Sequence, residues 1–146
     1  MKRKLHAIVG TFGFLIILTF WSSTVLSELF GTTQTIVQVK LMILTGMFAL
    51  IPTMIIAGAS GMAMGRRRKD APALAKKKRM PLIAANGLLV LVPAAFFLES
   101  RATSGTFDAA FYIVQGIELF AGAANLFLMG LNIRDGRKMA RRRVSA

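Results

Sequence analysis

Residues 41–65 read LMILTGMFALIPTMIIAGASGMAMG, which is 25 residues in a row without Asp, Glu, Lys or Arg. A helix needs about 20 predominantly apolar residues to cross the hydrocarbon core of a bilayer, which is about 30 Å thick. This stretch is therefore long enough to be a transmembrane helix. Taken alone, it is also compatible with a helix buried in the core of a soluble protein.

Three further stretches have the same character. Residues 7–27 and 80–98 carry no charge, and residues 109–133 carry one, Glu118. The chain has 146 residues, of which 55% are hydrophobic, and its mean hydropathy is +0.60. If all four stretches were core helices, too little polar chain would remain to cover them in water. We therefore predict an all-α, polytopic membrane protein.

The charges that separate these stretches suggest the boundaries of one transmembrane domain over residues 1–146. We expect two helical hairpins in an antiparallel four-helix bundle. A cationic loop at 66–79 joins the hairpins, and a basic tail at 134–146 follows the last helix. The expected helices cover residues 6–28, 36–65, 80–98 and 108–133.

The distribution of basic residues predicts the orientation. The chain has 19 Lys and Arg against 6 Asp and Glu, a net charge of +13, and 17 of the 19 lie near the N-terminus, in the 66–79 loop or in the tail. With four crossings these segments share one side. By the positive-inside rule that side is the cytoplasm, so we expect a bacterial inner-membrane protein with both termini inside. Trp21 and Tyr112 fall near the outer ends of their helices, as in an aromatic belt.

The same clusters bear on the partners. Lys and Arg beside a membrane helix attract anionic lipid head groups. No aromatic side chains are interleaved with them to stack on bases, so we expect the lipid bilayer as a partner and no nucleic acid.

Small residues follow one face of the second helix. Ala57, Gly61 and Gly65 recur every four residues, which allows another helix to approach closely. Packing within the bundle is the simpler explanation, and a seam between subunits is the alternative. Pro52 lies inside the same helix and predicts a kink.

Polar residues form a stripe along the fourth helix at spacings of three and four. Lipid cannot satisfy amides or a carboxylate, so this face should point into the bundle. Asn86 of the third helix lies at a depth similar to that of Asn125, which predicts a hydrogen bond between the two helices. The stripe consists of Gln115, Glu118, Gly122, Asn125, Met129 and Asn132.

Glu118 lies roughly 15 Å from the outer surface, near the midplane. A carboxyl group there has to be protonated, paired or next to water. Lys40 is the cation on the matching half of the second helix. It can reach inward to Glu118 or extend outward to the interface, and we expect it to extend outward. A hydrogen bond from Gln115, Gln38 or a serine is then the structural alternative for Glu118.

The composition excludes several classes of site. The chain has no cysteine and a single histidine, which excludes disulfides, thiolate metal sites and the usual histidine triads. His6 is a conceivable haem ligand only if a methionine or His6 of a second protomer supplies the other axial bond. We expect an interfacial, solvated histidine instead, and no metal or cofactor.

Three functions remain open. The first is a non-catalytic subunit, accessory or assembly factor that acts through helix packing, in a homo-oligomer or a larger membrane complex. The second is a small oligomeric channel or transporter that uses Glu118. The third is an electron-transfer protein that binds haem b through His6. No catalytic set is present in the sequence, so we do not expect an enzyme.

Overall fold

The computed structural model describes residues 2–65 and 71–144, and most of them are helical. This confirms the predicted all-α class, with four apolar helical spans long enough to cross a membrane: Leu5–Phe30, Thr33–Ala63, Ala73–Thr103 and Ala109–Lys138. The elements are α1 (Lys2–Phe30), α2 (Thr33–Gly65), α3 (Ala71–Asn86), the π-helix η1 (Gly87–Leu91), α4 (Val92–Thr103) and α5 (Ala109–Val144).

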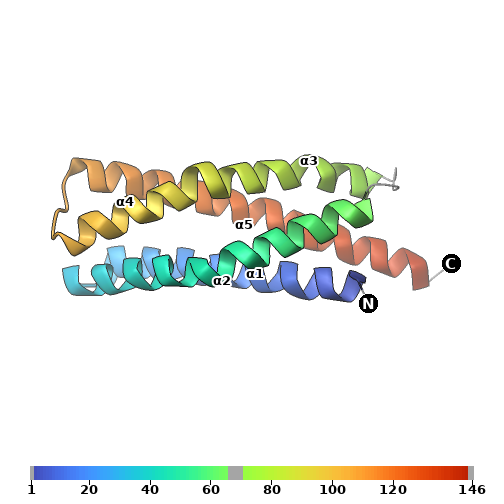
Figure 1. The fold of residues 1–146 in the computed structure, drawn as a ribbon, viewed down its shortest axis with the longest axis horizontal. Coiled ribbons are helices and arrows are strands. Elements are labelled where there is room, and N and C mark those ends of the chain that lie inside the picture. Colours follow the sequence, from blue (N-terminus) through green and yellow to red (C-terminus); the bar gives the residue numbers. More distant parts are fainter. Residues whose placement is uncertain (1, 66–70, 145–146) are drawn as a thin grey trace.

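The helices lie lengthwise beside one another (Figure 1). The turns at 31–32 and 104–108 lie at one end of the molecule, which we call the turn end. The other end, where α1 and α3 begin and α2 and α5 finish, we call the basic end. Helix α1 packs against α2 and α5, α2 also packs against α4, and α5 also packs against α3 and α4. Each helix therefore has neighbours on two sides and an outer face.

The helices extend further at the basic end than the sequence predicts. Residues 71–79, expected in a loop, form the first turns of α3, and α5 continues to Val144 through most of the expected tail. Residues 71–79 are rich in Ala and Lys, and residues 134–144 are rich in Arg, all of which favour helix. Pro72 stands in the first turn of α3, where it is tolerated. The charges mark the end of the apolar segment and not the end of the helix. Residues 66–70 of the cationic cluster lie outside the described chain.

The third span is continuous through α3, η1 and α4, but its hydrogen bonding changes in the middle. The N–H of Val92 bonds to the carbonyl of Gly87, five residues earlier. The next residue, Pro93, has no N–H to donate, so the regular α-helical pattern is already interrupted there. Pro52 lies inside α2, and Figure 1 shows α2 turning toward α3 in its second half.

The core consists of three apolar clusters along the bundle. Each joins residues from at least two of the four spans, so the core runs through the whole bundle. The clusters are Ile36, Leu98, Ala102 and Phe111 toward the turn end, Ile43, Met47 and Ala95 in the middle, and Ile17, Ile83 and Met129 toward the basic end.

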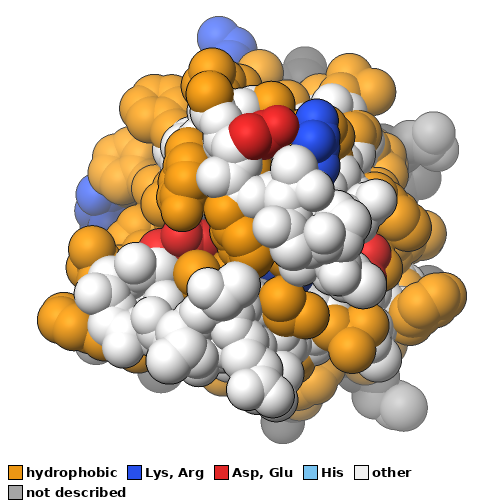
Figure 2. Space-filling model, turned by 90° about the vertical axis from the view of Figure 1, so that its left-hand side faces the viewer, with side chains coloured by type: hydrophobic (Ala, Val, Ile, Leu, Met, Phe, Trp, Pro, Cys, Tyr) orange, Lys and Arg blue, Asp and Glu red, His pale blue; other side chains and the backbone are white. Residues whose placement is uncertain are grey.

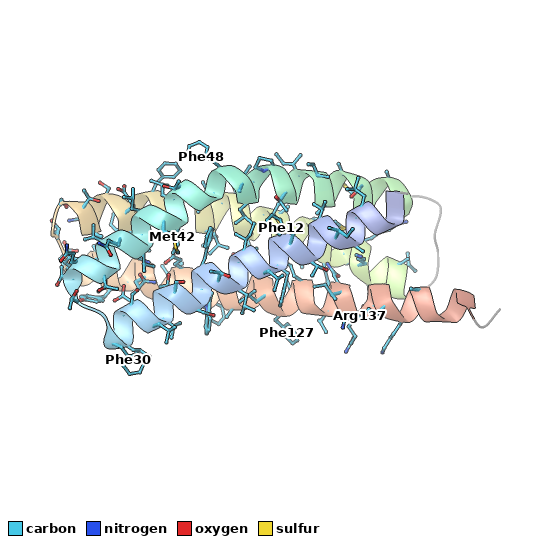
Figure 3. All side chains as sticks on the ribbon, turned by 90° about the horizontal axis from the view of Figure 1, so that it is seen from below. Phe12, Phe30, Met42, Phe48, Phe127 and Arg137 are labelled. Atoms are coloured by element: carbon cyan, nitrogen blue, oxygen red, sulfur yellow. The ribbon has the colours of Figure 1, made fainter. Side chains whose placement is uncertain are left out.

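The outer surface is also apolar. Phe48 and Phe127 point away from the bundle (Figure 3) and are 83% and 67% exposed, and Phe12 is 54% exposed. Viewed from the turn end, hydrophobic side chains cover the flanks (Figure 2). On this surface the hydroxyls of Thr19 and Thr45 donate to their own helix four residues back, at 2.9 and 2.8 Å. Apolar flanks with internally satisfied hydroxyls suit lipid and not water.

Candidate functional site

An ion pair joins α2 and α5 in the half of the bundle near the turn end. Nζ of Lys40 lies 2.8 Å from Oε2 of Glu118, and their side chains are 1% and 12% exposed. Nε2 of Gln115 donates to the same oxygen at 3.0 Å. The carboxylate thus has a cation and an amide as partners in the apolar interior.

This pair corrects the expected direction of Lys40. The outward, snorkelling conformation is wrong, because the side chain points into the bundle and is almost completely buried. Pairing with a carboxylate compensates the loss of hydration that an isolated ammonium group would suffer. Gln38, named as a possible partner of Glu118, lies on an exposed face of α2, whereas Gln115 makes the expected contact.

Polar groups of α1 extend this site toward the turn end. Thr24 and Ser27 are 2% and 3% exposed, and the Ser27 hydroxyl donates to the Thr24 carbonyl at 3.0 Å. Glu28 is half-buried, and the charges of Lys40 and Glu118 both act on its carboxyl group. These residues were not predicted as part of a site, although their spacing of three and four places them on one helix face.

Two oxygen atoms of this group have no hydrogen-bond partner among the described residues. They are Oε1 of Glu28 and Oε1 of Gln115, and both are buried. Gln115 is 4% exposed, and its amide nitrogen is fixed by Glu118. We call Glu28, Lys40, Gln115 and Glu118 the polar quartet.

Trp21 lies beside the quartet, on the side away from the turn end. Its indole N–H donates to the Leu119 carbonyl at 2.9 Å, so it points inward and not into an aromatic belt, whereas Tyr112 is 54% exposed. A small cavity of about 60 Å³ lies between Trp21, Thr24 and Glu118. Since a water molecule occupies roughly 30 Å³ in the liquid, this cavity has room for one or two.

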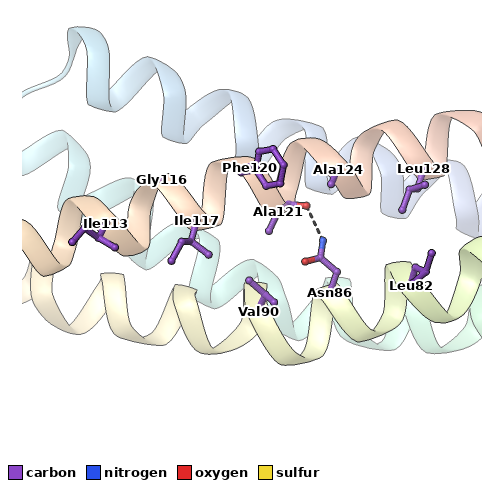
Figure 4. A pocket seen from close by; sticks show the side chains of 10 residues that line it. All are labelled: Leu82, Asn86, Val90, Ile113, Gly116, Ile117, Phe120, Ala121, Ala124 and Leu128. Carbon is purple, nitrogen blue, oxygen red and sulfur yellow. Dashed lines mark hydrogen bonds between the residues drawn. The ribbon is translucent and has the colours of Figure 1, made fainter.

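The two amides that match in depth meet as their positions predict. Nδ2 of Asn86 donates to Oδ1 of Asn125 at 2.9 Å. It also donates to the Ala121 carbonyl at 2.8 Å (Figure 4). Asn125 is 2% exposed and donates in turn to the Ile83 carbonyl at 3.4 Å. This contact holds α3 against α5.

At the basic end His6 is held between two helices. Its Nδ1 lies 3.0 Å from the hydroxyl of Ser60 in α2, and its Nε2 accepts from Nζ of Lys76 in α3 at 3.3 Å. The expectation that His6 is solvated is therefore wrong, since both ring nitrogens contact protein, whereas its place at the membrane interface stays a prediction. The sequence did not predict this contact, because residues 66–79 were expected to form a loop, whereas Lys76 is helical and faces the bundle.

A second ion pair lies nearby. Nη1 of Arg79 is 2.7 Å from Oδ2 of Asp135, which is 8% exposed, and Nε of Arg134 is 3.3 Å from the other oxygen of Asp135. From the sequence, these basic residues were expected to determine the topology and to contact anionic lipid, and no ion pair was predicted for them. The sequence signal that could have predicted this pair is Asp135 itself, an acidic residue within a basic segment, because a buried carboxylate needs a cation nearby.

The small-residue ladder of α2 packs within the chain. Ala57 is 7% exposed. A Cβ added to Gly61 would lie 2.8 Å from Cε of Met80 and 3.0 Å from Cε1 of His6. Gly61 therefore lets α1 and α3 approach α2. The surroundings of Gly65 lie outside the described residues.

The lateral face between α3–η1 and α5 contains an open groove with a volume of about 730 Å³ (Figure 4). A Cβ added to Gly116 would meet nothing within 4 Å, so the groove is open at this point. Its lining is apolar apart from Asn86, and consists of Leu82, Asn86, Val90, Ile113, Gly116, Ile117, Phe120, Ala121, Ala124 and Leu128.

Comparison of the chain with protein-family models, curated proteins and solved structures finds no match. Within residues 2–65 and 71–144, no three His, Asp or Glu side chains gather in a way that would hold a metal ion. The fold and these contacts define a class only: the four apolar spans indicate a multi-pass helical membrane protein.

Proposed function

We propose that this protein is a non-catalytic subunit, accessory or assembly factor of the bacterial inner membrane, and that it acts by helix packing. The groove between α3–η1 and α5 is the observation that carries this proposal. It spans residues 113–128 of α5, or about 22 Å of helix at 1.5 Å per residue. This length suits a transmembrane helix of a second copy or of another membrane protein.

The residues of the groove fit such a partner. Gly116, Ala121 and Ala124 are small, so a helix backbone can approach α5 closely, and association in lipid depends on such packing. Ile113 and Phe120 beside them are 64% and 81% exposed and would contact the partner on either side.

The orientation belongs to the same proposal. The two helical pairs, α1 with α2 and α3–α4 with α5, form hairpins whose basic end lies in the cytoplasm. The positive-inside rule supports this placement, since 17 of 19 Lys and Arg belong to the N-terminus, residues 66–79 and residues 134–146. The basic end would then contact anionic lipid head groups.

The polar contacts favour a structural role over transport. Glu118 is paired with Lys40 at 2.8 Å, and the cavity that it lines measures only about 60 Å³. A channel or transporter that used Glu118 would need a longer water-filled path. An electron carrier with haem on His6 would have to break the contacts of His6 with Ser60 and Lys76.

The groove is tested by the native mass of the full chain, purified in a mild detergent. We expect a second membrane chain at a fixed ratio. Gly116→Leu should release it, because the leucine extends into the groove from a position where an added Cβ meets nothing within 4 Å. Gly130→Leu is the matched control on α5, since a Cβ there also meets nothing within 4 Å. A monomeric wild type, or equal masses for both variants, would contradict the proposal.

A further inference from the structure

The polar quartet contains an imbalance of charge and of hydrogen bonds. Two carboxyl groups, Glu28 and Glu118, share one ammonium group, Lys40. Lys40 bonds to Glu118, which leaves the negative charge of an ionised Glu28 without a counter-ion in direct contact among residues 2–65 and 71–144. Partly buried charge near an apolar interior is unfavourable unless it is neutralised.

The unpaired oxygen atoms show that hydrogen-bond donors are also lacking in the quartet. Oε1 of Glu28 and Oε1 of Gln115 are both buried acceptors without a donor. Buried polar groups in proteins almost always have a partner. Gln115 cannot turn its amide to solve this, because its Nε2 already donates to Glu118 at 3.0 Å. What is missing is one hydrogen-bond donor with one positive charge.

We propose that the polar quartet is a proton-binding site, in which Glu28 carries one exchangeable proton beside the Lys40–Glu118 ion pair. One proton removes the excess negative charge and changes an oxygen of Glu28 from an acceptor to a donor. The carbonyl oxygen of Gln115 then accepts from it, directly or through one water. Lys40 from α2 and Glu118 from α5, the two helices packed on α1, are the charged groups that act on Glu28.

Position favours Glu28 over Glu118 as the proton carrier. Glu28 is two residues before the last residue of α1 and is half-buried, whereas the Glu118 side chain is 12% exposed and in direct contact with Lys40. A helical side chain leans toward the N-terminus of its helix. The carboxyl of Glu28 therefore extends from the turn end toward the other three residues of the quartet. Glu28 can therefore exchange its proton with the solution at the turn end.

Infrared difference spectroscopy of the purified full chain over a pH titration tests this site, because a protonated carboxyl and a carboxylate absorb differently. We expect one buried protonated carboxyl at neutral pH that ionises on raising the pH. Glu28→Gln should remove this band. Glu99→Gln, at the same end of the bundle but hydrogen-bonded to Thr103, should keep it.

Glu118→Gln separates the proposal from a purely structural role of Glu28. Without Glu118, Glu28 becomes the counter-ion of Lys40, so the protonated band should be lost although Glu28 is present. Three results would overturn the proposal: no protonated carboxyl in the wild type, a band that survives Glu28→Gln, or a band that disappears with added Na⁺ at constant pH. The last would make the quartet a sodium site. The test does not require a partner chain, so its outcome is independent of the groove.

Discussion

Removing the charge of Glu118 should lower the free energy of unfolding strongly, although the substitution Glu118→Gln barely changes the size of the side chain. Glu118→Gln keeps the shape of the side chain but leaves Lys40, 1% exposed, without its partner at 2.8 Å. Breaking a buried ion pair from one side costs about 3–5 kcal/mol in the free energy of unfolding. We expect a value near the lower limit, because Glu28 is close enough to act on Lys40.

The double variant Lys40→Met/Glu118→Gln should be more stable than Glu118→Gln alone. Both charges are then absent, and the methionine fills the space of the lysine stem. Replacing a buried pair by apolar groups is often neutral or stabilising. We therefore expect the effects of the two single substitutions to differ from additivity by about 1.5 kcal/mol or more.

The measurement is equilibrium unfolding of the four proteins in mixed detergent micelles. The chain has one tryptophan, and Trp21 is bonded to the Leu119 carbonyl inside the bundle, so its fluorescence reports on the folded state. Far-UV circular dichroism checks that both probes follow one transition. Single effects that add within about 0.5 kcal/mol would refute the buried ion pair.

Three further outcomes follow from the contacts. Gly61→Leu should lower the free energy of unfolding by about 1–3 kcal/mol through overpacking, because even a Cβ would lie 3.0 Å from Cε1 of His6. The control Gly58→Leu should not, because a Cβ there meets nothing within 4 Å. Equal stabilities of the two variants in thermal unfolding would contradict this. Gly122→Ala brings a methyl to 2.9 Å from Cδ1 of Trp21 and should shift the tryptophan emission to longer wavelength; an unchanged spectrum would show that the ring is not held there. The purified protein from haem-replete cells should be colourless, and a Soret band that His6→Ala removes would establish haem binding instead.

Much of the fold follows from residues that lack charge. The four uncharged stretches predict the four spans, since length and hydropathy are the quantities that a bilayer constrains. The partnership of Asn86 with Asn125 also follows, because distance from a helix end translates into depth at 1.5 Å per residue. Both inferences use only the position along a helix.

Other features depend on rotation about the helix axis and on neighbours. Depth alone places Lys40 near Glu118, but whether its flexible stem turns inward depends on how α2 is rotated against α5. Glu28 is the last residue of the first expected helix and was given no role there, because only the packing of α1 on α5 brings it near the ion pair. Residues 71–79 were assigned to a loop from their charge, although their helix propensity is high.

Site-specific labelling tests the transmembrane arrangement most directly. The chain has no cysteine, so single cysteines can be introduced without a background. Thr33 and Ser104 are exposed at the turn end, and Ala71 is exposed at the basic end. A membrane-impermeant maleimide should label Thr33→Cys and Ser104→Cys in intact cells and Ala71→Cys only after the membrane is opened. Labelling of Ala71→Cys in intact cells would contradict the four-span arrangement with its basic end in the cytoplasm.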